Sequence, residues 1–137
     1  PPPEINLVNE KNNGLAVLKL IRENLVLSAH DVSSGGIMVS LAEMSIASGY
    51  GLKIYKPKKL SSSLEYFFGE DQGRYLIEIS KNNLKKTESF LKQNNVFFEI
   101  IGEIQNDAFE LEKTFSLKTK DLLNFNNKWY NNYNAIN

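Results

Sequence analysis

The stretch His30-Asp31-Val32-Ser33-Ser34-Gly35-Gly36 carries the clearest potential for chemistry. It places ionisable side chains directly before small residues that are suited to opening a helix. Main-chain amides at a helix N-terminus bind phosphate or carboxylate groups, and glycine lets such a ligand approach closely. The candidate phosphate-contact residues in this stretch are Asp31, Ser33, Ser34, Gly35 and Gly36. The alternative is that a serine only caps the helix and that the glycines only allow the turn.

A second polar cluster, Phe68-Gly69-Glu70-Asp71-Gln72-Gly73-Arg74, comes directly before an expected strand. The guanidinium of Arg74 can bind a phosphate through two parallel hydrogen bonds. The side chains of Glu70 and Gln72 can accept hydrogen bonds from the hydroxyls of a sugar. These three residues are therefore further nucleotide-contact candidates. The alternative is a polar turn that is held together by its own salt bridge.

His30 is the only histidine, and the chain has no cysteine. A Ser-His-Asp or Cys-His nucleophile system therefore cannot be assembled, and thiolate or multi-histidine metal sites are excluded. His30 is a second-tier candidate, because a lone histidine in a short buried strand is usually a hydrogen-bonded core residue. Asp31 follows at the carboxyl end of that strand, where open α/β sheets bind their ligands.

The spacing of apolar residues predicts the elements that position these motifs. We expect helices over Leu15–Leu25, from Gly36 to a stop at Ser48–Gly51, over Leu64–Phe68, over Asn83–Gln93, and around Leu122–Tyr133. We expect strands over Val26–Val32, Gly51–Tyr55, Tyr75–Ile79, Val96–Ile101, Ala108–Leu111 and Thr114–Leu117. The first strand is predicted to lie in the interior of a sheet. Strands and helices alternate early and strands cluster late, which favours an α/β fold with a mixed sheet and helices mainly on one face.

The bulk composition fits one globular domain over residues 1–137, with 42% hydrophobic residues. Residues 1–7 resemble an extended linker, and the Asn-rich end from about residue 130 is a candidate for disorder. The lysines of Lys56-Pro57-Lys58-Lys59 are interpreted as solvated. Sixteen basic residues balance sixteen acidic ones, which argues against a nucleic-acid partner. The absence of a long apolar run and of a signal peptide indicates no membrane and a cytoplasmic location.

Two ordered motifs carry a family resemblance. The segment Ala29-His30-Asp31-Val32-Ser33-Ser34-Gly35-Gly36, continuing through Leu41-Ala42-Glu43-Met44, resembles the last domain of the phosphoribosylformylglycinamidine synthase large subunit, an AIR-synthase-related C-terminal domain. That family reads Ala-His-Asp-Val-Ser-Asp-Gly-Gly here, and its Phe-Gly-Glu-Ser-Gln-Gly-Arg is similar to Phe68–Arg74. Pro2–Leu7 and Ile101–Ile104 are similar to its linker and to its Ile-Gly-x-Val. Ser34 replaces a family acid, and Asp71 replaces a family serine, which adds negative charge where a phosphate would approach.

The resemblance implies an AIR synthase C-terminal-domain-like fold and a role in an ATP-dependent carbon–nitrogen ligase of purine biosynthesis. Such a synthase converts formylglycinamide ribonucleotide, ATP and glutamine-derived ammonia to the amidine, ADP and phosphate. The family's catalytic histidines and magnesium carboxylates lie in segments that this chain lacks, so no catalytic residue and no metal ligand are assigned, and the chain alone is predicted to be inactive. ATP and magnesium are implied as cofactors of the full-length enzyme, with none bound tightly by this chain. The implied partners are the remainder of the synthase chain and a glutaminase subunit or domain.

Two alternatives stay open at this point. The chain can be the equivalent domain of another AIR synthase superfamily member. It can also be a stand-alone interaction module that binds a partner through the Lys56–Lys59 region or through the Asn-rich end.

Overall fold

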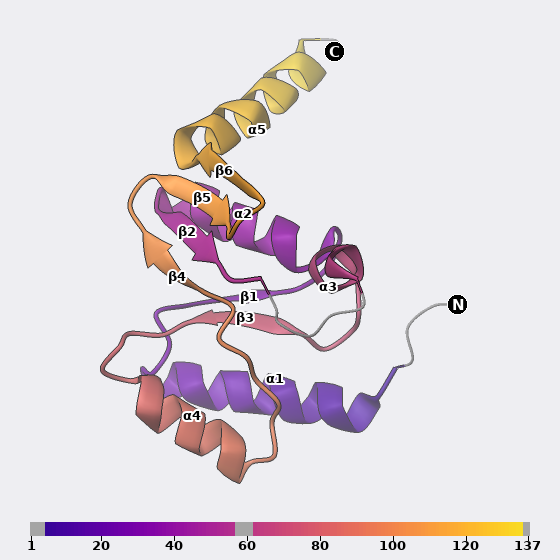
Figure 1. The fold of residues 1–137 in the computed structure, drawn as a ribbon. Coiled ribbons are helices and arrows are strands. Elements are labelled where there is room, and N and C mark those ends of the chain that lie inside the picture. Colours follow the sequence, from indigo (N-terminus) through magenta and orange to yellow (C-terminus); the bar gives the residue numbers. More distant parts are fainter. Residues whose placement is uncertain (1–4, 57–61, 136–137) are drawn as a thin grey trace. The chain divides into compact units, whose positions relative to one another are not determined.

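The computed structural model describes residues 5–56 and 62–135, and the chain forms two compact units (Figure 1). The first unit comprises Pro1–Ser40 and Leu64–Ile100, and the second comprises Leu41–Ser63 and Ile101–Asn137. Helix α2 (Gly36–Ser48) begins in the first unit and continues in the second. Both candidate motifs lie in the first unit.

A two-stranded antiparallel ladder organises the first unit. Strand β1 (Ser28–Asp31) pairs with β3 (Tyr75–Glu78), so that Asp31 lies opposite Tyr75. The amide of Val32 donates to the carbonyl of Arg74 at 2.9 Å and extends this pairing by one bond. Because β1 runs into the first motif and the second motif runs into β3, the antiparallel pairing brings the two motifs to the same end of the ladder.

The core of the first unit lies between helices α1 (Leu7–Arg22) and α4 (Leu84–Gln93). Leu20 of α1 is fully buried and clusters with Ala16, Leu25 and Leu91. The half-buried residues that pack against this cluster are Val26, Ile77, Phe90, Val96 and Phe98. Burying one leucine side chain contributes about 2 kcal/mol of stability, so this cluster stabilises the packing of α1 and α4 in the unit.

Helix α1 begins at Leu7, eight residues before its predicted start. Asn6 is the N-cap, and its side-chain oxygen accepts a hydrogen bond from the amide of Asn9 at 3.0 Å. The helix stops at Arg22 because Asn24 takes a left-handed conformation with φ 55°. The amide of Leu25 then donates to the carbonyl of Leu20, as in a Schellman motif. Leu7 is therefore helical and not part of a linker, while residues 1–4 lie outside the described residues.

The second unit is built on a four-stranded mixed sheet. Its order is β4-β2-β5-β6, with β2 (Gly51–Ile54), β4 (Gly102–Gln105), β5 (Ala108–Leu111) and β6 (Phe115–Lys118). β2 and β5 run parallel, and the other two pairings are antiparallel. The side chains of Ile54, Phe109 and Leu111 are buried. This sheet confirms the predicted α/β class, although the strands of the chain divide between two sheets.

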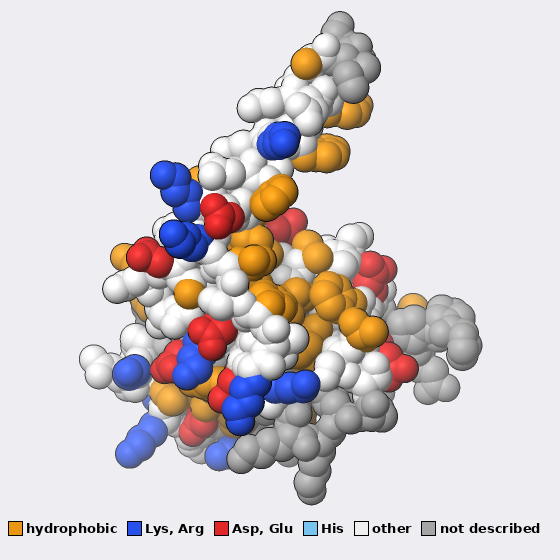
Figure 2. All heavy atoms as spheres, turned by 45° about the horizontal axis from the view of Figure 1, so that its top comes forward, with side chains coloured by type: hydrophobic (Ala, Val, Ile, Leu, Met, Phe, Trp, Pro, Cys, Tyr) orange, Lys and Arg blue, Asp and Glu red, His pale blue; other side chains and the backbone are white. Residues whose placement is uncertain are grey.

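Helix α5 (Thr119–Asn134) is the last element of the described chain, and it exposes hydrophobic side chains, which are orange in Figure 2. The side chains of Trp129 and Tyr133 stack with ring centroids 5.7 Å apart, and both are more than half exposed. Residues 130–134, which the Asn-rich composition made a candidate for disorder, are thus helical, and residues 136–137 lie outside the described residues. Of the predicted lysine loop only Lys56 is described. Of the helices in the described ranges, none combines the length and apolar character that crossing a membrane requires.

Two strand predictions were wrong. The segment 96–101 forms no strand, and the strand begins instead at Gly102. Its alternating pattern reflects Val96 and Phe98 packing against the core, while Phe97 between them is 84% exposed. Strand β1 was predicted to be interior, but it pairs only with β3 within the described residues, and its side chains alternate between half-buried and exposed.

Helix α3 (Ser63–Phe68) completes the elements around the site. Its predicted position is confirmed within one residue. Phe67 is 1% exposed and meets Tyr66 edge to face, with ring centroids 5.0 Å apart. This helix leads directly into the second motif, so the burial of Phe67 anchors the start of that motif.

Candidate functional site

The first motif forms a tight turn, Ser33–Gly36, which we call the glycine turn. The amide of Gly36 donates to the carbonyl of Ser33 at 3.0 Å, and α2 begins at Gly36 as predicted. Gly35 and Gly36 have φ of 80° and 68°, a left-handed conformation that glycine adopts without strain. The hydroxyl of Ser40, which is 1% exposed, donates to the carbonyl of Gly36 at 3.2 Å and holds the turn from inside.

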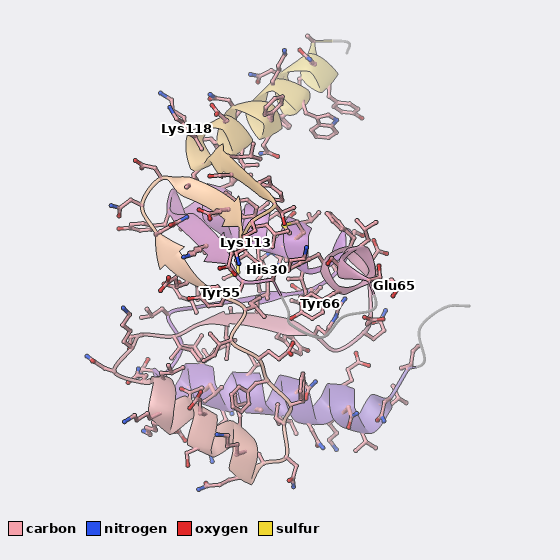
Figure 3. The ribbon with its side chains drawn as sticks, viewed as in Figure 1. His30, Tyr55, Glu65, Tyr66, Lys113 and Lys118 are labelled. Carbon is pink, nitrogen blue, oxygen red and sulfur yellow. The ribbon has the colours of Figure 1, made fainter. Side chains whose placement is uncertain are left out.

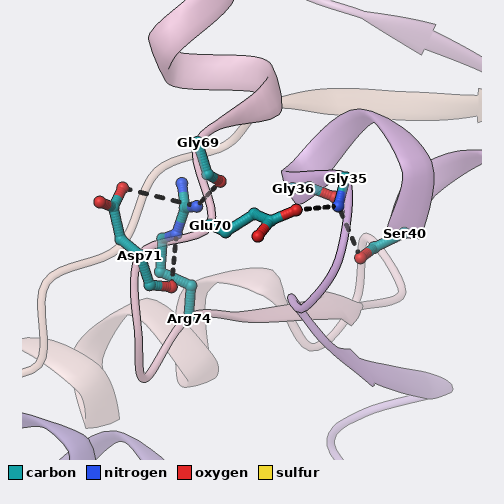
Figure 4. Close-up of polar contacts among 7 residues, drawn as sticks. All are labelled: Gly35, Gly36, Ser40, Gly69, Glu70, Asp71 and Arg74. Atoms are coloured by element: carbon teal, nitrogen blue, oxygen red, sulfur yellow. Dashed lines mark hydrogen bonds and ion pairs between the residues drawn. The ribbon is translucent and has the colours of Figure 1, made fainter. Parts of the chain in front are cut away.

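The second motif forms a loop, Gly69–Arg74, which we call the Arg74 loop (Figure 4). The guanidinium of Arg74 donates to the carbonyl of Gly69 and lies 3.5 Å from the carboxylate of Asp71. Its Nε also points to the carbonyl of Asp71 at 3.4 Å. The loop is therefore the polar turn with its own salt bridge that the sequence left open as an alternative. The fork of Arg74, which an incoming phosphate would need, already has partners within the loop.

The structure brings the glycine turn and the Arg74 loop together. The amide of Gly35 donates to a carboxylate oxygen of Glu70 at 2.7 Å (Figure 4). This distance lies at the short end of the range for N–H···O hydrogen bonds. The main chain of residues 67–69 also lies close to the glycine turn. A Cβ added at Gly36 would lie 2.7 Å from the carbonyl oxygen of Gly69 and 2.8 Å from that of Phe67.

Asn13 is a structural contact of the site that sequence reasoning missed. Its side-chain amide donates to the carbonyl of Gly73 at 3.0 Å, which ties α1 to the Arg74 loop. Gly73, with φ 69°, packs against Glu10 so closely that an added Cβ would lie 3.2 Å from the Cα of Glu10. The sequence signal was hidden because apolar periodicity placed the start of the helix beyond both residues.

The remaining candidates lie around this contact. The side chains of Asp31, Ser33, Ser34 and Gln72 are exposed, whereas Gly36 is buried. The Nδ1 atom of His30 lies 2.5 Å from the carbonyl oxygen of Asp31 and 3.9 Å from its carboxylate, and the side chain is 30% exposed (Figure 3). The imidazole is thus engaged with the main chain of its own strand. Within residues 5–56 and 62–135, no three acidic or imidazole side chains gather closely enough to hold a metal ion.

Tyr66 lies beside the site on α3 (Figure 3) and ties it to the segment 96–101. Its hydroxyl donates to the carboxylate of Glu99 at 2.8 Å. Burial of the ring, followed by the hydrogen bond to Glu99 and the negative charge of Glu99, raises the pKa of Tyr66 from 10.0 to about 12. The nearby Arg74 opposes this rise.

The raised pKa of Tyr66 predicts a pH dependence of folding. The folded state keeps the phenolic proton between pH 10.0 and about 12, where the unfolded chain loses it. The stabilisation is therefore complete below pH 10.0 and is lost as the pH rises through this window. NMR of the Tyr66 ring should show it mostly protonated at about pH 11, whereas the same residue in denaturant is mostly ionised. Glu99→Gln should lower the pKa toward 10.0; a Tyr66 pKa that Glu99→Gln leaves unchanged would contradict this account.

Comparison with known proteins places this fold and these motifs. Residues 3–112 match the family model described as AIR synthase related protein, C-terminal domain. The chain belongs to this family. The match to AIR synthase related C-terminal domains includes the glycine turn and the Arg74 loop, and it ends before α5.

Curated relatives agree with the family assignment, and solved structures share the fold. The chain is 44% identical over 133 residues to the phosphoribosylformylglycinamidine synthase subunit PurL of Pelagibacter ubique. The matched region covers 97% of this chain and 18% of that relative. The chain thus spans about a fifth of the length of that relative. The structure of PurLQS from Thermotoga maritima matches 88% of this chain and 22% of its own chain, with a TM-score of 0.74 and 16% identity. The structure of T. maritima PurL complexed with ATP matches 82% of this chain and 21% of its own chain, with a TM-score of 0.71 and 17% identity.

Proposed function

We propose that this chain is the C-terminal, non-catalytic domain of a phosphoribosylformylglycinamidine synthase. The observation that carries the proposal is the sequence match to a PurL subunit across 97% of the chain. The full-length synthase converts formylglycinamide ribonucleotide, ATP and glutamine-derived ammonia to formylglycinamidine ribonucleotide, ADP and phosphate. The reacting groups come from the rest of the synthase chain, which is the first partner of this domain.

The domain contributes one wall of a nucleotide-side cleft through the glycine turn and the Arg74 loop. Its work is positioning and shielding, because Glu70 and Arg74 are already bonded within the domain. The nucleotide-side candidates are Asp31, Ser33, Ser34, Gly35, Gly36, Glu70, Gln72 and Arg74, with His30 second to them. No proton transfer is assigned to any of them.

The cofactors and further partners of the full-length protein follow from the same proposal. ATP is its nucleotide, in line with the ATP complex of the T. maritima relative, and magnesium accompanies it. A glutaminase subunit or domain supplies ammonia, in line with the PurLQS assembly of T. maritima. The balanced charge of sixteen basic and sixteen acidic residues fits a protein without a nucleic-acid partner. The proposed location is the cytoplasm.

Arg74→Ala in the full-length synthase tests the assigned role. The substitution removes the bond to Gly69 and the pairing with Asp71, so the Arg74 loop should loosen. We expect the melting temperature to fall, with nucleotide affinity weakened and kcat retained within about threefold, since a positioning role leaves the chemical step intact. Steady-state kinetics and calorimetry with ATP measure these quantities. The matched control is Arg22→Ala, which removes an exposed arginine from α1.

Two outcomes contradict this role. A loss of kcat by about 100-fold or more at an unchanged melting temperature shows that Arg74 takes part in the chemistry. Unchanged nucleotide affinity together with unchanged thermal stability shows that Arg74 is an ordinary surface residue.

A further inference from the structure

The carboxylate of Glu70 occupies the position that an anionic ligand of the glycine turn would take. The amide of Gly35 donates to it at 2.7 Å. A main-chain amide bonded to a carboxylate in this way has its donor capacity filled. The contact is reinforced by the close approach of the main chain of residues 67–69 to Gly36, so it does not depend on one hydrogen bond alone.

The Arg74 loop is held on its other sides as well. The side chain of Asn13 donates to Gly73, the amide of Val32 donates to the carbonyl of Arg74, and the guanidinium of Arg74 donates to Gly69. These ties come from α1, from the residue after β1 and from the loop itself. A loop bonded at each of these points keeps Glu70 close to the glycine turn.

An external anion would meet an unfavourable environment here. To reach the amide of Gly35 it would have to displace the carboxylate of Glu70 and would then lie beside that negative charge. The side chain of Asp71 is 57% exposed, and its charge is partly compensated by Arg74 at 3.5 Å. The negative charge of Glu70 disfavours the binding of an anion, and the only arginine of the loop is already paired with Asp71.

We infer that Glu70 is a positioning residue which acts as the internal anion of the glycine turn. It fixes the Arg74 loop to the start of α2 and keeps the turn closed to external phosphate. As a consequence, the two motifs form one preorganised wall, which presents the exposed side chains of Ser33, Ser34 and Gln72 to the nucleotide-side cleft. Only this consequence rests on the proposed function. The contact itself is a property of this chain.

Amide exchange at Gly35 tests the inference. Glu70→Ala removes the acceptor, so NMR should show the exchange rate of the Gly35 amide with solvent rising by about tenfold or more, the effect of losing one hydrogen bond to a charged group. Glu70→Gln keeps a neutral acceptor and should give a smaller rise. The matched control is Glu88→Gln, the same change on α4 of the same unit, which should leave Gly35 unchanged.

A titration with inorganic phosphate completes the test. In the unsubstituted protein the Gly35 and Gly36 resonances should not move with phosphate concentration. A saturable shift of these resonances overturns the inference, as does a Gly35 exchange rate that is the same in Glu70→Ala as in the parent. If Glu70→Ala fails to fold, the Gly35 exchange rate in Glu70→Gln and the phosphate titration still test the inference. The proposed synthase role is tested separately by kinetics, so either can fail without the other.

Discussion

Gly36→Ala is expected to lower the free energy of unfolding by about 2–4 kcal/mol. Two costs add at this position. A left-handed φ of 68° is unfavourable for alanine by about 1 kcal/mol or more. The new Cβ would also lie 2.7 to 2.8 Å from the carbonyl oxygens of Gly69 and Phe67 and from the carbonyl carbon of Phe68. These are main-chain atoms, so relief requires the end of α3 and the start of the Arg74 loop to shift, and overpacking of this kind costs about 1–3 kcal/mol further.

Gly49→Ala is the matched control for this substitution. Gly49 has φ 75°, but no heavy atom lies within 4 Å of the position that its Cβ would take. The control therefore carries the conformational cost alone, about 1 kcal/mol. Denaturant unfolding followed by circular dichroism gives both values. If Gly36→Ala is no more destabilising than Gly49→Ala, the close approach of the loop to the glycine turn is refuted.

The sequence predicted most elements because their apolar spacing is local. α2 began where the glycine turn predicted it, and α4 and β5 also lie where their patterns indicated. The errors arose where a pattern reports burial without reporting hydrogen bonding. The segment 96–101 alternates like a strand because one side of it covers the core, but within the described residues no strand is paired with it.

The start of α1 was missed for a different reason. Leu7 and Val8 are 73% and 68% exposed, so they add nothing to a periodic buried face. The N-cap bond between Asn6 and Asn9 is the local signal that marks this start. Without it, Asn13 could not be placed on a helix beside the Arg74 loop, and its contact with Gly73 went unpredicted.

The candidate site was predictable in its members but not in their bonding. Residue types singled out the glycine turn and the Arg74 loop, and the family resemblance joined them. Which of these groups remain available to bind a ligand depends on geometry that the sequence does not show. Glu70 reaches Gly35, and Arg74 turns back to Gly69 and Asp71, so groups that resembled ligand contacts bond with one another.

The most direct test of the central claim is a turnover assay of the 137-residue chain by itself. It receives formylglycinamide ribonucleotide, ATP, magnesium and either glutamine or ammonia, with a full-length synthase assayed in parallel as the positive control. Formation of ADP and of the amidine is measured. The account predicts no product above the protein-free background, because the chain offers one imidazole, engaged with its own main chain, and no clustered metal ligands in its described residues. Turnover that persists through repurification and falls in a His30→Ala variant would contradict the account.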